Sequence, residues 1–330
     1  MLVVITLTYI AYITFYEKPE HKTDETIVSE KEQKKLAVDS GIISFVGKSS
    51  KAVIDAFGKP DRIDPSRYDY EWWVYNKDLN HYKQFGILDG KVVTVYGIGK
   101  DVNLSPFKIG QTSDQIFHLI SPVPYISVKI GLNSYRFELS ESDMNVRPTV
   151  PFTRDVYVQL YIDKYNGTLS SVRAFNAHTF VKQRPYEMAY RGNLLEAEPI
   201  PEAKWRKIEQ GEERQIFDIT NVIRKRTGLV TLKWNGKAAE AAYLHSKEMS
   251  DKGYFSHESP EKGTLLDRLT LAEVSFELAG ENIAQGYMDG IDAVEGWLNS
   301  PGHRKNLLEN RFTQLGVGVY RNFYTQNFIK

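Results

Sequence analysis

The stretch from Gly253 to Gly318 decides the fold of the C-terminal half of this 330-residue chain. It contains four short blocks, which read Gly-Tyr-Phe-Ser-His at 253–257, Gly-Glu-Asn at 280–282, Trp-Leu-Asn-Ser-Pro-Gly-His at 297–303 and Phe-Thr-Gln-Leu-Gly-Val-Gly at 312–318. Two of the seven histidines of the chain lie in these blocks, beside a carboxylate, glycines and aromatic residues. This combination of polar and aromatic residues predicts a polar cleft.

Periodic patterns on both sides of this stretch predict helices and strands. Apolar residues recur at helical spacing from about 210 to 228, and Asn235 caps a second helix that continues to 252. Ser300 and Pro301 predict the N-cap and first residue of another helix, which places His303 in its first turn. The helix dipole disfavours a charged imidazole there, so a neutral His303 could ligate a metal, accept a hydrogen bond or simply brace its own turn. Alternation at 314–320 and 324–329 predicts two terminal strands.

Residues 39–195 contain an internal repeat of one short helix followed by strands. The two copies begin at Phe45 and Phe107, and they are offset by about 63 residues, which suits a duplicated α+β unit rather than a solenoid. Strands are predicted at 70–75, 84–88 and 91–96 in the first copy and at 135–139, 156–162 and 168–174 in the second. Asp-Gly at 89–90 and Asn-Gly at 166–167 predict hairpin turns. No catalytic cluster stands out in this region.

The N-terminal residues have a different composition. Residues 1–16 are almost entirely apolar, and this run is shorter than the roughly twenty residues that cross a bilayer. Its aromatic end nevertheless resembles a membrane–water boundary. We interpret residues 1–16 as a membrane anchor or uncleaved signal and the charged residues 17–38 as a polar tether; a buried N-terminal strand is the alternative for 1–16. A second break, the proline-containing segment 196–208, predicts a linker.

Composition limits the classes of partner. Lys plus Arg and Asp plus Glu both number 42, so the chain has no global basic field and nucleic acid is not an expected partner. Cysteine is absent, which excludes disulfides and thiolate metal sites. Hydrophobic residues make up 42% of the chain, and its length suggests two domains with substantial cores.

The segment from about Gln210 to Lys330 resembles the CAP superfamily (cysteine-rich secretory proteins, antigen 5, pathogenesis-related 1) in its bacterial SCP form. The matching motifs are Asn221-x-x-Arg224-x-x-x-Gly228, Leu232-x-Trp234, His245-Ser-x-x-Met249, Phe255-Ser-His257, Gly280-Glu-Asn-Ile-Ala284, Trp297-x-x-Ser-Pro-Gly-His303-Arg and Phe312-Thr-x-x-Gly-Val-Gly318. Residues 39–195 resemble the CAP-associated N-terminal domain of spore-forming and related Gram-positive bacteria. The resemblance implies an α+β protein, with the duplicated α+β domain followed by a CAP-type α-β-α sandwich over 209–330.

The resemblance also implies a cleft lined by two histidines and two glutamates. His257 matches the first family histidine, and Glu281 matches the glutamate of the Gly-Glu-Asn motif. The other two positions fall on Arg311 and Ser300, and the guanidinium of an arginine is no metal ligand and repels a cation. His303 is the candidate for the missing imidazole. The candidate cleft residues are therefore His257, Glu281, Asn282, Ser300, His303 and Arg311.

Three functions remain open at this stage. An extracellular binding module of the bacterial cell envelope, tethered to the membrane or secreted, would use the cleft for a lipid, peptide or cell-wall ligand without catalysis. A divalent-metal-dependent hydrolase of peptide or peptidoglycan would bind a metal such as zinc through His257 and His303, with Glu281 as general base or third ligand. An adaptor would contact a partner through residues 39–195. The incomplete set of cleft residues favours the binding module.

Overall fold

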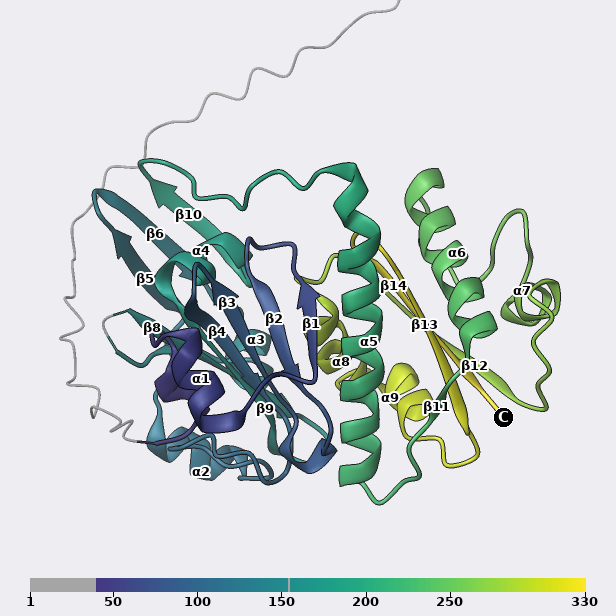
Figure 1. The fold of residues 1–330 in the computed structure, drawn as a ribbon, viewed down its shortest axis with the longest axis horizontal. Helices are drawn as coiled ribbons and strands as arrows, with labels where there is room; N and C mark the ends of the chain where they lie inside the picture. The colour runs from purple at the N-terminus through teal and green to yellow at the C-terminus, as the bar shows by residue number, and fades with distance from the viewer. Residues whose placement is uncertain (1–39, 154) are drawn as a thin grey trace, which may run out of the picture. The chain divides into compact units, whose positions relative to one another are not determined.

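The computed structural model describes residues 40–153 and 155–330 (Figure 1). The anchor expected at 1–16 and the tether at 17–38 lie outside these residues. Within the described part of the chain, none of the helices has both the length and the apolar character needed to span a membrane. The described residues all belong to one compact unit.

The N-terminal region is built on a seven-stranded antiparallel sheet. Its strand order is β1-β2-β3-β4-β9-β8-β7, and a separate sheet has the order β10-β6-β5. The elements are η1 (Ile42–Phe45), α1 (Ser50–Phe57), β1 (Arg62–Pro65), β2 (Glu71–Tyr75), η2 (Leu79–His81), β3 (Lys83–Leu88), β4 (Lys91–Gly97), α2 (Ser113–Leu119), β5 (Tyr125–Ile130), β6 (Asn133–Glu138), α3 (Glu141–Val146), β7 (Thr149–Pro151), β8 (Val156–Asp163), β9 (Thr168–Asn176), α4 (Ala177–Gln183) and β10 (Glu187–Arg191).

The two repeat copies take equivalent places in the large sheet. The order of the sheet is symmetric about the central pair β4 and β9, with β3 and β8 outside that pair and β2 and β7 beyond. The helix of each copy begins in the same way, because the amide of Ser50 donates to the carbonyl of Gly90 at 2.7 Å and the amide of Ser113 donates to Gly167 at 2.8 Å. Each helix start is therefore fixed to the hairpin turn of its own copy.

One predicted strand of the second copy lies in the other sheet. The residues expected at 135–139 form β6, which pairs with β5 and β10 and not with β8. The counterpart of β2 is instead the short strand β7, which pairs with β8. An insertion of β5, β6 and α3 separates the second helix from its hairpin. Alternating burial identifies a strand, but it does not identify the partner of that strand.

The C-terminal region is an α-β-α sandwich. A four-stranded sheet with the order β11-β13-β14-β12 has α6 packed on β13 and β14, while α5 also packs on β13 and α8 on β12 (Figure 1). The elements are α5 (Glu202–Arg226), β11 (Lys233–Trp234), α6 (Gly236–Lys252), α7 (Leu265–Leu271), β12 (Ala279–Gln285), α8 (Gly290–Leu298), α9 (Pro301–Leu307), β13 (Gln314–Tyr320) and β14 (Phe323–Ile329).

The Gly-Val-Gly block explains how closely α6 packs on the sheet. A Cβ atom added to Gly318 would lie 1.9 Å from the backbone nitrogen of Tyr243 in α6. Val317, between the two glycines, points to the opposite face and is buried in the cluster that contains Ile216 and Ile219 of α5. Alternation along β13 therefore separates a face of backbone contact from a face of aliphatic packing.

Helix α5 joins the two regions and lies between their sheets in Figure 1. It starts at Glu202, about two turns earlier than apolar periodicity indicates, so the segment expected as a linker at 196–208 is helical in its second half. These extra turns are held by charge and aromatic contacts. Arg321 pairs with Glu202 at 2.6 Å, and its guanidinium lies 4.1 Å from the ring centre of Trp205. A polar helix start of this kind gives no apolar signal in the sequence.

The two regions share one hydrophobic core. Trp72 and Tyr96 of the N-terminal sheet belong to the same buried cluster as Ile216 of α5 and Trp297 of α8. Trp72 is therefore a core residue at the junction of the two regions, since only 2% of it is exposed. The strands of the N-terminal sheet and the helices of the sandwich bury each other.

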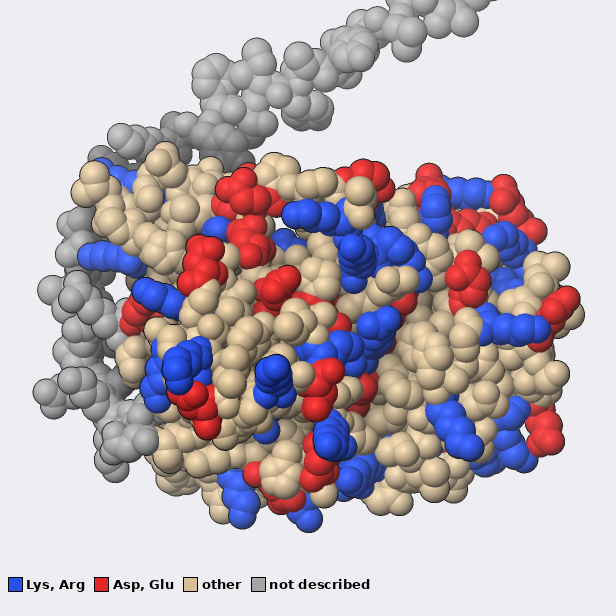
Figure 2. All heavy atoms as spheres, viewed as in Figure 1, with Lys and Arg blue, Asp and Glu red and all other residues tan. Residues whose placement is uncertain are grey.

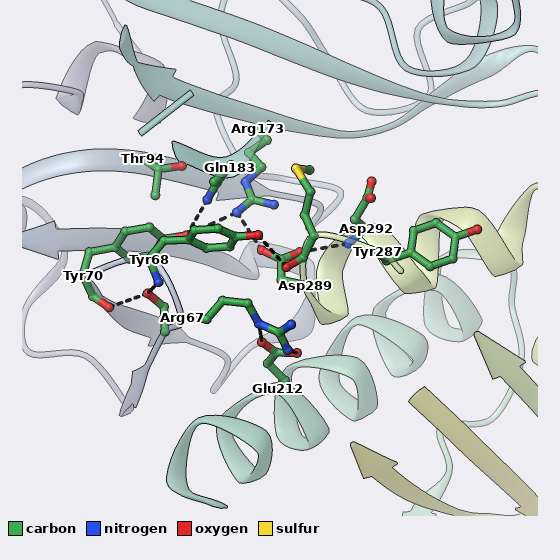
Figure 3. A network of polar contacts seen from close by, with 12 residues as sticks. Arg67, Tyr68, Tyr70, Thr94, Arg173, Gln183, Glu212, Tyr287, Asp289 and Asp292 are labelled. Atoms are coloured by element: carbon green, nitrogen blue, oxygen red, sulfur yellow. Dashed lines mark hydrogen bonds and ion pairs between the residues drawn. The ribbon is translucent and has the colours of Figure 1, made fainter. Parts of the chain in front are cut away.

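Buried ion pairs cross the same boundary (Figure 3). Arg67 donates to both carboxylate oxygens of Glu212 in α5, each at 2.8 Å. Arg173 of β9 is fully buried and pairs with Asp289 at 2.7 Å. Since a buried charge without its partner is strongly destabilising, these pairs fix how the two regions dock. On the outer surface, acidic and basic side chains are intermixed over the face drawn in Figure 2.

Candidate functional site

An imidazole and a carboxylate form the centre of the site that the motifs predict as a cleft. Glu281 lies on β12, and its side chain is only 3% exposed. His257 lies on the loop after α6, where Gly253 ends the helix in the left-handed conformation. The Nδ1 atom of His257 is 2.9 Å from Oε1 of Glu281. The structure therefore brings together the two residues that the motifs indicate most directly.

A buried arginine, which no sequence motif indicates, completes this centre. Arg268 of α7 donates from one terminal nitrogen to Oε2 of Glu281 at 2.5 Å. Its other terminal nitrogen donates to the carbonyl of His257 at 2.8 Å and to that of Gly263 at 3.1 Å. Arg268 thus fixes both the carboxylate and the backbone of the histidine loop. The available sequence signal was weak: a basic residue in an otherwise apolar turn, after the capping box of Thr264.

These contacts decide which atom of His257 is available. A carboxylate accepts hydrogen bonds, so Nδ1 of His257 carries the proton that it donates to Glu281. In the neutral ring, Nε2 is then the unprotonated nitrogen and points away from the carboxylate. The His257 side chain is 58% exposed, whereas those of Glu281 and Arg268 are each 3% exposed. The site therefore offers one oriented acceptor atom to a ligand.

The second histidine is held close by through an amide network. Asn282 is fully buried, and its side chain donates to the carbonyl of His303 at 3.2 Å. Asn306 of α9 donates to Oδ1 of Asn282 at 3.0 Å and to the carbonyl of Glu281 at 3.0 Å. A Cβ on Gly280 would meet the Asn306 side chain at 3.0 Å, so the Gly-Glu-Asn motif needs its glycine for this close approach. Asn282 thus braces the backbone of His303. No sequence motif indicates Asn306, which holds Asn282 in turn.

The environment of His303 favours its neutral form. Partial burial lowers the pKa of His303, and the nearby charge of His257 lowers it further. The lowered pKa agrees with the neutral form predicted from the place of His303 in the first turn of α9, but its largest cause is burial. His303 is therefore held as a neutral imidazole near His257.

Arg311 and Ser300 do not take part in the hydrogen bonds that join His257, Glu281 and Arg268. The Arg311 side chain is 61% exposed, and its guanidinium is bound to the carboxylate of Glu309 at 2.9 Å. The cation that contacts Glu281 is Arg268 instead. Ser300 is the N-cap residue of α9 and Pro301 is at the start of the helix, as predicted, but the Ser300 side chain makes no capping hydrogen bond.

The expected metal ligands do not form a ligand group. Across residues 40–153 and 155–330, no three His, Cys, Asp or Glu side chains are placed to hold one metal ion. Glu281 already uses one oxygen for His257 and the other for Arg268. A divalent cation would have to displace a buried guanidinium to reach this carboxylate. The residues therefore do not fit the three-ligand zinc site that a hydrolase requires.

The fold and the cleft together define a class of protein, an α-β-α sandwich that presents an imidazole oriented by a buried glutamate. The chain belongs to the cysteine-rich secretory protein (CAP) family, which residues 217–329 match, and residues 46–186 match the CAP-associated N-terminal family. The resemblance drawn from the motifs and the expected fold class are both confirmed.

Relatives match over most of the chain. The uncharacterized membrane protein YlbC of Bacillus subtilis is 49% identical over 336 residues, which cover 100% of this chain and 97% of the relative. An extracellular protein containing a SCP domain from Bacillus anthracis has a solved structure with 46% identity and a TM-score of 0.85, covering 92% of this chain and 100% of that one. A cysteine-rich secretory protein from Staphylococcus aureus gives 29% identity and a TM-score of 0.79, covering 88% and 93%.

Proposed function

We propose that this chain is a non-enzymatic binding module of the bacterial cell envelope and that it recognises its ligand through His257. The observation that carries this proposal is the double engagement of Glu281 by His257 and Arg268. A carboxylate with both oxygens in use positions the imidazole and is not free to act as a general base. Recognition then depends on Nε2 of His257.

The chemistry of this atom limits the class of ligand. Nε2 of a neutral imidazole accepts one hydrogen bond, so it suits a ligand that offers an O–H or N–H group. Sugar hydroxyls and peptide amides of cell-wall polymers provide such groups. Phe255, two residues before His257, is 49% exposed and supplies an aromatic surface on the same loop. An exposed aromatic side chain beside a hydrogen-bonding group is suited to both sugar and peptide ligands.

The relatives support a place outside the cytoplasm. One relative of nearly the same length carries the description of a membrane protein, and one similar solved structure is described as an extracellular protein. An extracytoplasmic module needs no cysteine when its core is large, and the core here spans both regions.

The metal-dependent hydrolase is a second candidate, and two neighbouring imidazoles favour it. Its test is isothermal titration of zinc into the wild type and into a His257→Ala, His303→Ala double variant. Tight binding that the double variant loses would support the hydrolase, because two histidines would then be shown to act as ligands. We expect no tight binding, since Arg268 holds the only carboxylate that contacts His257 among the described residues.

Co-sedimentation with purified insoluble cell walls, and separately with phosphatidylglycerol vesicles, tests the binding module. We expect the full-length chain to bind the walls and His257→Ala to bind at least tenfold more weakly. His81→Ala is the matched control, because His81 is 55% exposed and its Nδ1 also contacts a carboxylate, that of Asp78, at 2.8 Å. Release of wall fragments into solution, or equal binding by His257→Ala and the wild type, would contradict the proposal.

A further inference from the structure

The turn between β5 and β6 carries the most exposed large apolar side chain among the described residues. Gly131 and Leu132 form this two-residue turn, and Gly131 has a positive φ of 59°. Leu132 is 102% exposed, so its side chain adds nothing to the packing of the fold. Glycine and small polar residues are the usual choice at such turn positions. The apolar side chain of Leu132 is therefore available to a partner beyond the end of this sheet.

The neighbouring strand β10 holds the turn in place. The side-chain oxygen of Asn133 accepts from the backbone amide of Asn193 at 2.9 Å, and the hydroxyl of Tyr135 donates to the carbonyl of Asn193 at 2.6 Å. Gly192 has a φ of 98°, and a Cβ atom there would meet the side chain of Asn133. The exposure of Leu132 thus follows from a turn that is braced on both of its strands.

Three cationic side chains lie behind the turn, on the exposed face of the same sheet. Lys129 of β5 and Arg191 of β10 both lie opposite Ser134 of the central strand β6, and Arg136 lies two residues further along β6. Opposite residues of paired strands have Cα atoms about 4.5–5.5 Å apart, so these long side chains reach a common area. All three are exposed, and none forms an ion pair within the described part of the chain.

The segments that build this end of the sheet contain no carboxylate. Residues 121–137 and 188–195 include three basic residues and no Asp or Glu, although the whole chain has 42 residues of each sign. The acidic residues of the exposed face are Glu138 and Glu187, which lie opposite each other at the end away from the turn. The surface around Leu132 is therefore locally cationic and complements a negatively charged partner.

Exposed aromatic rings lie on the same strands. Tyr125 of β5 is 44% exposed and Tyr190 of β10 is 51% exposed. The guanidinium of Arg136 lies 3.8 Å from the ring centre of Tyr125. Apolar, aromatic and basic side chains that are exposed together are typical of protein surfaces that contact the interface of an anionic membrane.

We propose that the turn at Leu132 and the basic residues behind it, Lys129, Arg136 and Arg191, form a contact surface for a bilayer of anionic lipids. The Leu132 side chain enters the headgroup boundary, and the three cations lie at the lipid phosphates. Each basic residue near such a surface strengthens binding about fivefold. A soluble polyanion would pair with the cations but would leave Leu132 in water, so a bilayer accounts for both features.

This contact would also orient the site at His257. Figure 1 shows β5, β6 and β10 at the opposite end of the described residues from α7, the helix that follows the His257 loop. The two regions share one core, so a bilayer at Leu132 leaves the His257 loop on the side away from the membrane. The inference concerns a separate surface: it does not depend on the ligand proposed for His257, and it does not rest on residues 1–38.

The accessibility of position 132 in the full-length chain tests this contact. The chain has no cysteine, so Leu132→Cys introduces a single thiol for a membrane-impermeant maleimide. Labelling is compared on vesicles of phosphatidylcholine alone and of phosphatidylcholine and phosphatidylglycerol in equal parts, so any binding through other segments is common to both samples. We expect the rate to fall at least tenfold on the anionic vesicles, and the difference to shrink below about twofold in 1 M NaCl.

Leu271→Cys in α7 is the matched control, because the native side chain is also apolar and is 69% exposed. Its labelling rate should be the same on both kinds of vesicle. Equal rates at position 132 on the two kinds of vesicle would overturn the proposal. Equal slowing at positions 132 and 271 would do the same, because the protection would then not be specific to the turn.

Charge removal and a soluble competitor distinguish the bilayer from other occupants. Adding Lys129→Gln and Arg191→Gln to Leu132→Cys should return the rate on anionic vesicles to within about twofold of that on phosphatidylcholine. Lys237→Gln, at a lysine that is 59% exposed on α6, should leave the protection unchanged. Full protection after the loss of both cations would contradict the proposal. Equal protection by soluble polyglycerol phosphate on phosphatidylcholine vesicles would assign the surface to a polyanion instead and would overturn it.

Discussion

The Nδ1 atom of His257 lies 2.9 Å from Oε1 of Glu281, and this contact joins an exposed side chain to a buried one. The other oxygen of Glu281 accepts from Arg268, which also holds the backbone carbonyl of His257. A strand residue, Glu281, and a helix residue, Arg268, thus hold the imidazole of the loop residue His257 in a fixed orientation. In this arrangement, Glu281 and Arg268 position the group and His257 makes the contact.

Replacement of Glu281 by glutamine should destabilise the chain. Glu281→Gln leaves the buried guanidinium of Arg268 without a counter-charge, and breaking a buried pair in this way costs about 3 kcal/mol. Urea denaturation followed by circular dichroism measures the change in the free energy of unfolding. Glu309→Gln is the control, since its partner Arg311 is 61% exposed and solvent replaces the lost contact. Equal stability of wild type and Glu281→Gln would show that the pair is not formed.

Stability should fall at acid pH because of His245. This residue is 1% exposed, its Nε2 donates to the carbonyl of Ser256 at 2.9 Å, and its Nδ1 has no partner within the described residues. Burial lowers the pKa of His245 below its usual value of 6.5. A lowered pKa in the folded state means that the unfolded chain takes up the proton first. The stabilisation is therefore present above pH 6.5 and is lost as the pH falls through the folded-state pKa.

Comparison with His245→Gln isolates this contribution. The free energy of unfolding of wild type should drop between pH 7.5 and pH 5, and that of His245→Gln should drop less over the same interval. A remaining decrease is expected from His303, whose pKa is also lowered. Identical pH dependence in the two proteins would contradict the assignment to His245.

The shared core predicts that both regions unfold together. Scanning calorimetry of the full-length chain should show one transition, because Trp72 and Ile216 belong to one buried cluster. Arg173→Met should lower the free energy of unfolding by about 3 kcal/mol or more, since it leaves Asp289 buried without its cation. Arg191→Met, at an exposed position of β10, is the control. Two separate transitions in the wild type would contradict a common core.

Two glycines test the packing of the sandwich. Gly318→Ala should destabilise by about 2 kcal/mol or more, because its Cβ would meet the α6 backbone at 1.9 Å. Gly302→Ala in α9 should be neutral or stabilising by about 0.5 kcal/mol, since no heavy atom lies within 4 Å of the added Cβ. Thermal and urea unfolding of both variants give the comparison. A larger cost at 302 than at 318 would show that α6 does not pack on this face of β13.

The sequence predicted those parts of the site that depend on local signals. Asn235 caps α6 and Pro301 begins α9, because capping and proline preferences act within a few residues. The closeness of His257 and Glu281 followed from motif resemblance. No motif indicates Arg268, because its role depends on a contact with another element. The motifs predict Arg311 at the cleft, and the structure shows its guanidinium bound to Glu309, two residues earlier.

The fold shows the same division between local and tertiary information. The hairpin turn at 89–90 joins β3 to β4, because Asp89 and Gly90 both adopt the left-handed conformation that a two-residue turn requires. Gly167 is also left-handed, and it ends the longer turn between β8 and β9. The residues 135–139 have the alternation of a strand, but the sheet that receives them depends on an inserted segment. The common core of the two regions could not be read from either region alone, because its apolar residues look like the ordinary core of separate domains.

The binding isotherm of the full-length chain on purified cell walls tests the role of His257 most directly. Wild type, His257→Ala and His81→Ala are compared, with soluble wall fragments measured in the same samples. We expect at least a tenfold loss of affinity for His257→Ala, unchanged affinity for His81→Ala and no release of fragments. Equal affinity of all three proteins, or fragment release that depends on His257, would contradict a non-enzymatic binding role for this cleft.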